Sequence, residues 1–199
     1  MGVIGTSKKD RCGVIDRIEI VHTDGLTGKV TRHTYPPEGK KGWLFRLLCK
    51  LHLKSHAVMT NYGTGGIYDL VSFVTGIASP STYLYIGIGT GTTAATASDT
   101  QMSGSSTYSK SVTPTRANST GSLGDEAVWT HVFSQANDSS LTDTWAVDEV
   151  AIQNAASNAA GHMLTHIAGS SQYGAADNCI WGNGDTLSIT IESGEIPIR

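Results

Sequence analysis

Cysteine is scarce in this sequence, and the few cysteines are far apart. Cys12, Cys49 and Cys179 are the three present in 199 residues, and an odd number cannot close a complete disulfide framework. No Cys-x-x-Cys pair occurs, which excludes a zinc site built on that spacing. Free cysteines are usually small buried residues, so we expect three buried or half-buried thiols.

Long apolar stretches are also lacking. No run of about 18 apolar residues is present to span a membrane, and the start MGVIGTSKKD lacks the apolar core of a secretion signal. We therefore expect a protein that is made in a cytoplasm and leaves it, if at all, by another route such as lysis.

Charged residues are few, at 16%, and the apolar fraction of 39% is below the globular norm. Gly, Thr, Ser and Ala fill the deficit, with 23 glycines in the chain. Thr favours strands, while Ser and Gly favour turns and loops. This composition is typical of a β-protein whose sheet surface is half-buried and carries hydroxyl groups rather than charges.

The charges are unevenly distributed. The first 60 positions hold 11 of the 14 basic residues and five acidic ones, a net +6, whereas the rest holds three basic and 12 acidic residues, a net −9. Such halves attract each other within a chain or between copies. We divide the chain into a basic arm and hairpin for docking at 1–60, a short helix and linker at 61–80, and a β-sandwich body at 81–199.

Short alternating apolar runs separated by turn signals predict strands. They cover residues 14–23, 29–35, 83–89, 107–114, 126–133, 144–153, 162–168 and 187–191. The segment DGLTG at 24–28 suits a hairpin between the first two, and apolar residues at helical spacing predict one short helix within 61–74. The fold class is therefore mainly β: an antiparallel, jelly-roll-like β-sandwich with an N-terminal hairpin and one short helix.

Residues 40–58 are the most basic part of the chain. An amphipathic basic stretch suggests a membrane surface or nucleic acid, but its period changes from helical to alternating at Cys49, so it makes no continuous face. We favour a packed segment whose basic residues face solvent or an acidic neighbour, and we do not expect nucleic-acid binding. The candidate docking residues are Lys40, Lys41, Trp43, Arg46, Lys50 and Lys54.

Two motifs suggest ligands but fit them poorly. GIGTG at 87–91 follows a predicted strand, but a dinucleotide site needs a helix to begin there, so we interpret it as a glycine-rich turn. His162 and His166 form H-x-x-x-H, which reaches one metal on a helix but spans about 13 Å on a strand. Strand-like neighbours favour the second geometry, so we predict no metal site.

Carboxylates show no catalytic spacing. Asp148 and Glu149 are adjacent on a predicted strand and point to opposite faces, which makes a poor acid–base pair. Asp177 and Asp185 lie on either side of Asn183-Gly184, which we interpret as a hairpin turn without the spacing of a calcium loop. No G-x-S-x-G elbow places a nucleophile. We predict no catalytic residue and no cofactor.

Aromatic residues leave two interpretations open. Together with Tyr83 and Tyr85, the surface candidates Trp129, Trp145 and Trp181 could line a platform for sugar rings. Such residues more often fill a sandwich core or a subunit interface.

Several runs resemble, in the same order, a pattern found in structural proteins of tailed phages and prophages. They are IEIVHTDGLTGKV, then Asn61 with Gly63 and the apolar run after it, then YLYIGIGTGTTAATASDTQM, WAVDEVAIQNAASNAAGHMLTH and GNGDTLSITIE, together spanning most of residues 18–192. The chain departs from the pattern in its basic WLFRLLCKLHLK insert and in Ala151-Ile152-Gln153, which replaces a usual G-L-F. The resemblance implies a β-sandwich that oligomerises and implies no catalytic residues.

The resemblance therefore leads us to expect a non-enzymatic structural component of a tailed-virus particle: a capsid-decorating, collar or tail/fibre protein. Its partners would be further copies of itself and other virion proteins, and its location would be the virion. An alternative is a receptor- or carbohydrate-binding module that contacts a host-surface glycan. An enzyme such as a depolymerase is a third hypothesis, which no motif supports.

Overall fold

The computed structural model describes residues 15–35, 58–59, 83–96, 98–117, 126–156, 162–168 and 177–193. Their elements are β1 (Ile15–Thr23), β2 (Val30–Tyr35), β3 (Val58–Met59), β4 (Tyr85–Gly89), β5 (Thr107–Ser111), β6 (Thr115–Ala117), β7 (Glu126–Phe133), β8 (Thr144–Val147), β9 (Glu149–Gln153), β10 (Met163–Ala168), β11 (Asp177–Ile180), the 3-10 turn η1 (Trp181–Asn183) and β12 (Thr186–Ser193). The predicted mainly β class is confirmed.

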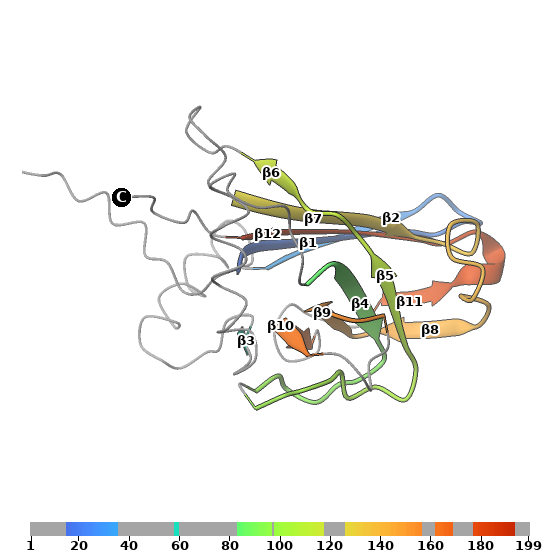
Figure 1. Ribbon diagram of the computed structural model, residues 1–199. Helices are drawn as coiled ribbons and strands as arrows, with labels where there is room; N and C mark the ends of the chain where they lie inside the picture. The colour runs from blue at the N-terminus through green and yellow to red at the C-terminus, as the bar shows by residue number, and fades with distance from the viewer. Residues whose placement is uncertain are drawn as a thin grey trace, which may run out of the picture.

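The strands form three antiparallel sheets (Figure 1). Sheet A is five-stranded with the order β2-β1-β12-β7-β6, and sheet B is five-stranded with the order β3-β10-β9-β4-β5. Sheet C pairs β11 with β8. Neighbours in each sheet run antiparallel.

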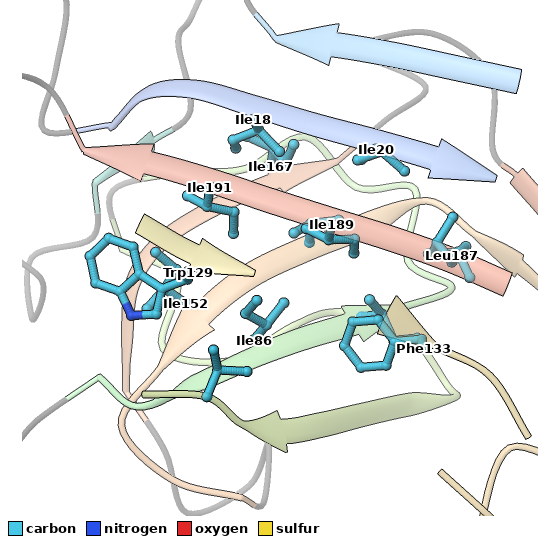
Figure 2. Packing of buried hydrophobic residues seen from close by; sticks show 14 of the residues in the cluster. Ile18, Ile20, Ile86, Trp129, Phe133, Ile152, Ile167, Leu187, Ile189 and Ile191 are labelled. Carbon is cyan, nitrogen blue, oxygen red and sulfur yellow. The ribbon is translucent and has the colours of Figure 1, made fainter. Parts of the chain in front are cut away.

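One apolar core joins the sheets, as Figure 2 shows for its larger side chains. Sheet A contributes Ile18, Ile20, Trp129, Phe133, Leu187, Ile189 and Ile191, and sheet B contributes Ile86, Ile88, Val150, Ile152, Leu164 and Ile167. Val147, Cys179 and Trp181 add the side of sheet C and its following turn. Apolar burial is the main favourable term in folding, and this face-to-face arrangement is consistent with the predicted sandwich.

Sheet A follows the alternation that its sequence predicts. Leu187, Ile189 and Ile191 of β12 are fully buried, whereas the residues between them are half-buried on the other face. One face of sheet A therefore belongs to the core, and the other carries polar side chains.

The inner strands β9 and β10 of sheet B are buried on both faces. Every residue of β9 and of β10 is buried. The chain between β4 and β5, drawn in green along the lower side of Figure 1, packs on the outer face. There Met102 joins Ala151 and Met163 in a second apolar cluster. A Cβ on Gly87 would lie 2.8 Å from the terminal carbon of Met102, so the sheet and this loop approach closely.

The predicted N-terminal hairpin is confirmed, but it is no separate docking arm. β1 pairs with β2 on one side and with β12 on the other, so the hairpin lies inside sheet A. Val58 and Met59 likewise add β3 to sheet B. The described strands of the expected segment 1–60 therefore lie in the same sheets as strands of the body expected at 81–199.

Two predicted connections are also wrong. The single strand expected at 144–153 divides at Asp148, whose N–H donates to the Gly89 carbonyl at 2.9 Å, so that β8 lies in sheet C and β9 in sheet B. The turn at Asn183-Gly184 closes no hairpin, because β11 pairs with β8 while β12 pairs with β1 and β7. Gly184 adopts a left-handed φ of 86° there, which glycine tolerates.

The predicted helix within 61–74 and the candidate docking residues, Lys40, Lys41, Trp43, Arg46, Lys50 and Lys54, lie outside the described residues. Across the described ranges, no helix is both long and apolar enough to cross a membrane.

Candidate functional site

Among the described residues, the carboxylate with the most hydrogen bonds belongs to Glu149, which is at the start of β9 and fully buried. Its Oε1 accepts hydrogen bonds from the Ser103 N–H and hydroxyl, both at 2.7 Å. Its Oε2 accepts from the N–H groups of Gly91 at 3.1 Å and Gly104 at 2.9 Å. His166 completes the set, with Nε2 3.1 Å from Oε1. Both ends of the loop at 90–106 are thus tied to one side chain.

The glycines of this loop allow that approach. A Cβ on Gly91 would lie 2.2 Å from the Ser103 hydroxyl and 2.4 Å from the Glu149 carboxyl carbon. A Cβ on Gly104 would lie 2.6 Å from the Gly91 nitrogen, and one on Gly89 would lie 2.7 Å from Glu149 Oε2. The GIGTG run therefore supplies one backbone N–H, that of Gly91, to an anion, and the anion is a side chain of the same protein.

His166 links Glu149 to a second carboxylate. Its Nδ1 lies 2.8 Å from Asp99 Oδ2, and Asp99 in turn accepts the Thr96 N–H at 2.8 Å. The His166 side chain is only 2% exposed, and both ring nitrogens face a carboxylate, so the imidazolium form donates twice. We call Asp99, Ser103, Glu149 and His166 the Glu149 cluster.

The pKa values in this cluster favour its charged form. Burial opposes the charge on Glu149, but the hydrogen bonds from His166 and Ser103 outweigh it and lower the pKa of Glu149 to about 2. Burial likewise opposes the His166 charge, yet the bonds to Glu149 and Asp99 raise the pKa of His166. Hydrogen bonds from Thr96 and His166 similarly lower the pKa of Asp99 against its partial burial.

A second buried carboxylate, Asp138, links sheet B to the turn after β7. Its Oδ1 accepts from Lys110 Nζ at 2.7 Å and from the Tyr108 hydroxyl at 3.2 Å. Its Oδ2 lies 3.0 Å from His131 Nε2. Burial opposes the charge, but Lys110 and His131 outweigh it and lower the pKa of Asp138. Side chains of β5 and β7 thereby meet at one carboxylate.

A third group lies where the β1–β2 turn meets η1. Asp185 accepts the N–H groups of Gly25 at 2.9 Å and Ile180 at 2.8 Å, and its Oδ2 lies 3.0 Å from His22 Nε2. Against burial, these contacts lower the pKa of Asp185. Asp177 lies 3.1 Å from His33 Nε2, which ties β11 to β2.

The His and carboxylate motifs singled out in the sequence lie in strands or in the contacts between them. His166 lies on β10 and His162 immediately before it, in the extended geometry that was predicted. The groups of His, Cys, Asp and Glu in the described ranges include none of three or more that could hold a metal ion. Asp148 and Glu149 are both buried, and Asp177 and Asp185 belong to the group at the β1–β2 turn.

The aromatic candidates are mostly internal, so for Trp129 and Trp181 the structure favours the core interpretation over the sugar platform. Trp181 is fully buried and Trp129 is 2% exposed, with its indole N–H donating to the Tyr83 carbonyl at 3.0 Å. Trp145 is half-buried and packs edge-on against Trp181, with ring centroids 6.5 Å apart. Trp129 and Trp181 belong to the apolar core, and Trp145 packs against it.

The one cysteine in the described ranges is Cys179, and it is fully buried as expected. Burial, with Asp177 and Asp185 nearby, raises the pKa of its thiol. Thiolate is the reactive form of cysteine, so this residue acts as a core side chain. Cys12 and Cys49 lie outside the described residues.

Sequence reasoning missed the role of Glu149 and its partner Ser103. The signal in the sequence was an acidic residue directly before the mostly apolar run VAIQ, together with glycines at 89, 91 and 104.

Comparisons with protein-family models, curated proteins and solved structures found no match.

Proposed function

We propose that this protein is a non-enzymatic structural component of a tailed-virus particle and acts by assembling with other copies and with neighbouring virion proteins. The observation that carries the proposal is that the buried Glu149 carboxylate is bound entirely by groups of the same chain. Five hydrogen bonds from the loop at 90–106 and from His166 occupy its two oxygens, and its side chain is fully buried.

The resemblance and the geometry support each other at this point. GIGTG, the S-D-T of the loop and D-E-V of β9 are among the runs that resemble the virion family. Here the same runs supply Gly91, Asp99 and Glu149 to one cluster. Residues that hold a long loop against a sheet are what a particle protein needs, because loops are otherwise the most mobile part of a fold.

The polar residues that suggest chemistry are engaged in the same way elsewhere. The carboxylates of Asp138, Asp185 and Asp177 each form hydrogen bonds to at least one element that is distant in the sequence. A catalytic acid or base has to reach substrate, whereas these carboxylates are buried and hydrogen-bonded. This favours a structural role over a depolymerase.

The alternative of a glycan-binding module loses its main support. Trp129 and Trp181 are buried, so they offer no face to a sugar ring. No other described feature favours a glycan, and we do not propose that function.

The test is to locate the protein in particles released on lysis of cells that encode it. Gradient-purified, salt-washed particles are analysed by mass spectrometry, and the purified protein is analysed by light scattering over a range of concentrations. We expect a stoichiometric component of the particle and a concentration-dependent oligomer. Absence from washed particles would contradict the proposal.

A further inference from the structure

The four outer strands of the two large sheets differ in how they are protected. Exposed edges are templates for pairing with another chain, and proteins usually shorten, charge or cover them. β3 has two residues and β6 has three. β5 is flanked by the turn that carries Asp138, which binds its Tyr108 and Lys110.

Within the described residues, β2 is neither short nor covered. It is six residues long, contains no proline or lysine, and pairs with β1 without a register shift from Val30 to Tyr35. In the described part of the chain, β1 is its one neighbouring strand. Figure 2 shows β2 in light blue beside β1, on the side away from β12.

The hairpin geometry indicates which backbone groups face outward. The Asp24 N–H donates to the Lys29 carbonyl at 3.0 Å, and the Asp24 carbonyl accepts the Gly28 N–H at 2.8 Å, so Asp24 is at a hydrogen-bonded position across the hairpin. Hydrogen-bonded and non-hydrogen-bonded pairs alternate along antiparallel strands. Val30, Arg32 and Thr34 are therefore in non-hydrogen-bonded positions, and their N–H and C=O groups point away from β1.

Among the described residues, two charged or polar side chains of β2 are directed toward neighbouring strands rather than along this edge. Arg32 Nη1 lies 2.9 Å from Glu19 Oε1. This ion pair directs the Arg32 side chain toward β1 and balances its charge. His33 Nε2 lies 3.1 Å from Asp177 on β11. Val30 is 58% exposed, which is apolar area that a neighbouring strand would cover.

From this geometry we propose that β2 pairs antiparallel with β2 of a second copy, so that sheet A continues through the contact into its partner. The inference rests on the proposed function and identifies one of its contacts. A two-fold contact uses the same edge on both copies and leaves neither open, and it matches the outward groups of Val30, Arg32 and Thr34 with an identical set.

The decisive variant is Thr34→Pro in the full chain. Proline removes an outward N–H and is tolerated on edge strands where the N–H faces solvent, so the bonds to β1 remain. We expect sedimentation velocity to show that the wild-type dimer falls to the mass of one chain, 21.0 kDa, with circular dichroism unchanged. A dimer that persists in Thr34→Pro would overturn the inference.

A second pair of variants keeps the test decisive if Thr34→Pro fails to fold. Val30→Lys places like charges at the proposed contact, whereas Thr130→Lys places the same charge on the exposed face of central strand β7. We expect only Val30→Lys to separate the copies. If Thr130→Lys alone does so, the copies meet through the sheet face and the inference fails.

The outcomes separate this inference from the proposed function. In one outcome, particles retain the protein as a stoichiometric component, but Thr34→Pro and Val30→Lys still dimerise. That result refutes the β2 contact and leaves the proposed function standing. A wild-type protein that is monomeric at all concentrations, yet is lost from particles in the Thr34→Pro variant, means that β2 receives a strand from a different virion protein. Self-pairing would then be rejected.

Discussion

Sheets A and B have the same number of strands but treat their polar residues differently. In sheet A, Thr190 and Glu192 lie on the half-buried outer face of β12. In sheet B, Glu149, Gln153 and His166 also stand outside the apolar core, but the loop at 90–106 covers that side and all three are buried. Alternation therefore predicts a strand and its core face, but not whether the polar face meets water.

The same difference applies to the ion pairs. On sheet A, Arg32 is paired with Glu19 while its side chain is 63% exposed, and such pairs contribute about 0–1 kcal/mol. On sheet B, His166 and Glu149 are 2% and 0% exposed. Removing one member of a buried pair costs about 3–5 kcal/mol, because it leaves the other charge uncompensated.

The largest effect is expected from Glu149→Ala. It would leave the N–H groups of Gly91, Ser103 and Gly104 and the charged ring of His166 without their acceptor. We expect a loss of about 3–5 kcal/mol in the free energy of unfolding, measured by urea denaturation at pH 6.

The matched control on sheet A is Glu19→Ala. It removes a glutamate that is ion-paired to Arg17 and Arg32, and we expect it to cost no more than about 1 kcal/mol. Equal losses for the two variants would mean that covering a sheet face does not set the strength of its ion pairs.

A smaller effect is expected from Gly91→Ala, which tests how closely the loop fits over sheet B. The added Cβ would lie 2.2 Å from the Ser103 hydroxyl and 2.4 Å from the Glu149 carboxyl carbon, so the loop must shift. We expect a loss of about 1–3 kcal/mol, the usual range for an overpacked site, measured by thermal unfolding.

The control glycine for that variant is Gly182, between sheets C and A. A Cβ there meets nothing within 4 Å, so Gly182→Ala should change stability by no more than about 0.5 kcal/mol. If Gly91→Ala is equally harmless, the hydrogen bonds to Glu149 leave more room than the distances indicate.

The strands were predictable because alternation is a local property. Residues 126–133 form β7 as predicted, and β12 extends the predicted run at 187–191 to Thr186 and Ser193. The break at Asp148 is marked in the sequence by a change of phase, because Trp145 and Val147 occupy odd positions whereas Val150 and Ile152 occupy even ones. That β8 and β9 then join different sheets was not predictable, because it depends on pairing with strands far away in the sequence.

The Glu149 cluster was predictable only in part. The glycines at 89, 91 and 104 and the acidic residue beside an apolar run were visible, but the bond from Ser103 to Glu149 spans 46 positions. Such a contact depends on how the whole loop lies over sheet B. The buried Trp129 and Trp181 show the same limit, because periodicity marks aromatic residues without telling a core face from a binding face.

The smallest effect is expected on the alkaline side of the pH dependence of stability, and its sign follows from the cluster. The pKa of Glu149 is lowered from 4.5 to about 2, so its contribution is present above 4.5 and is lost as the pH falls toward 2. The pKa of His166 is raised above 6.5, so its contribution is complete below pH 6.5 and is lost as the pH rises through the folded value.

Urea midpoints measured from pH 5 to pH 9 should therefore decline on the alkaline side in the wild type. The decline should be smaller than the loss in Glu149→Ala, because deprotonation of His166 leaves the backbone donors on Glu149 in place. His166→Gln keeps a donor for one carboxylate but cannot titrate, so its alkaline slope should be flatter. Identical slopes in the two proteins would place the titrating group elsewhere, and the covered face of sheet B would then respond to pH no differently from the open face of sheet A.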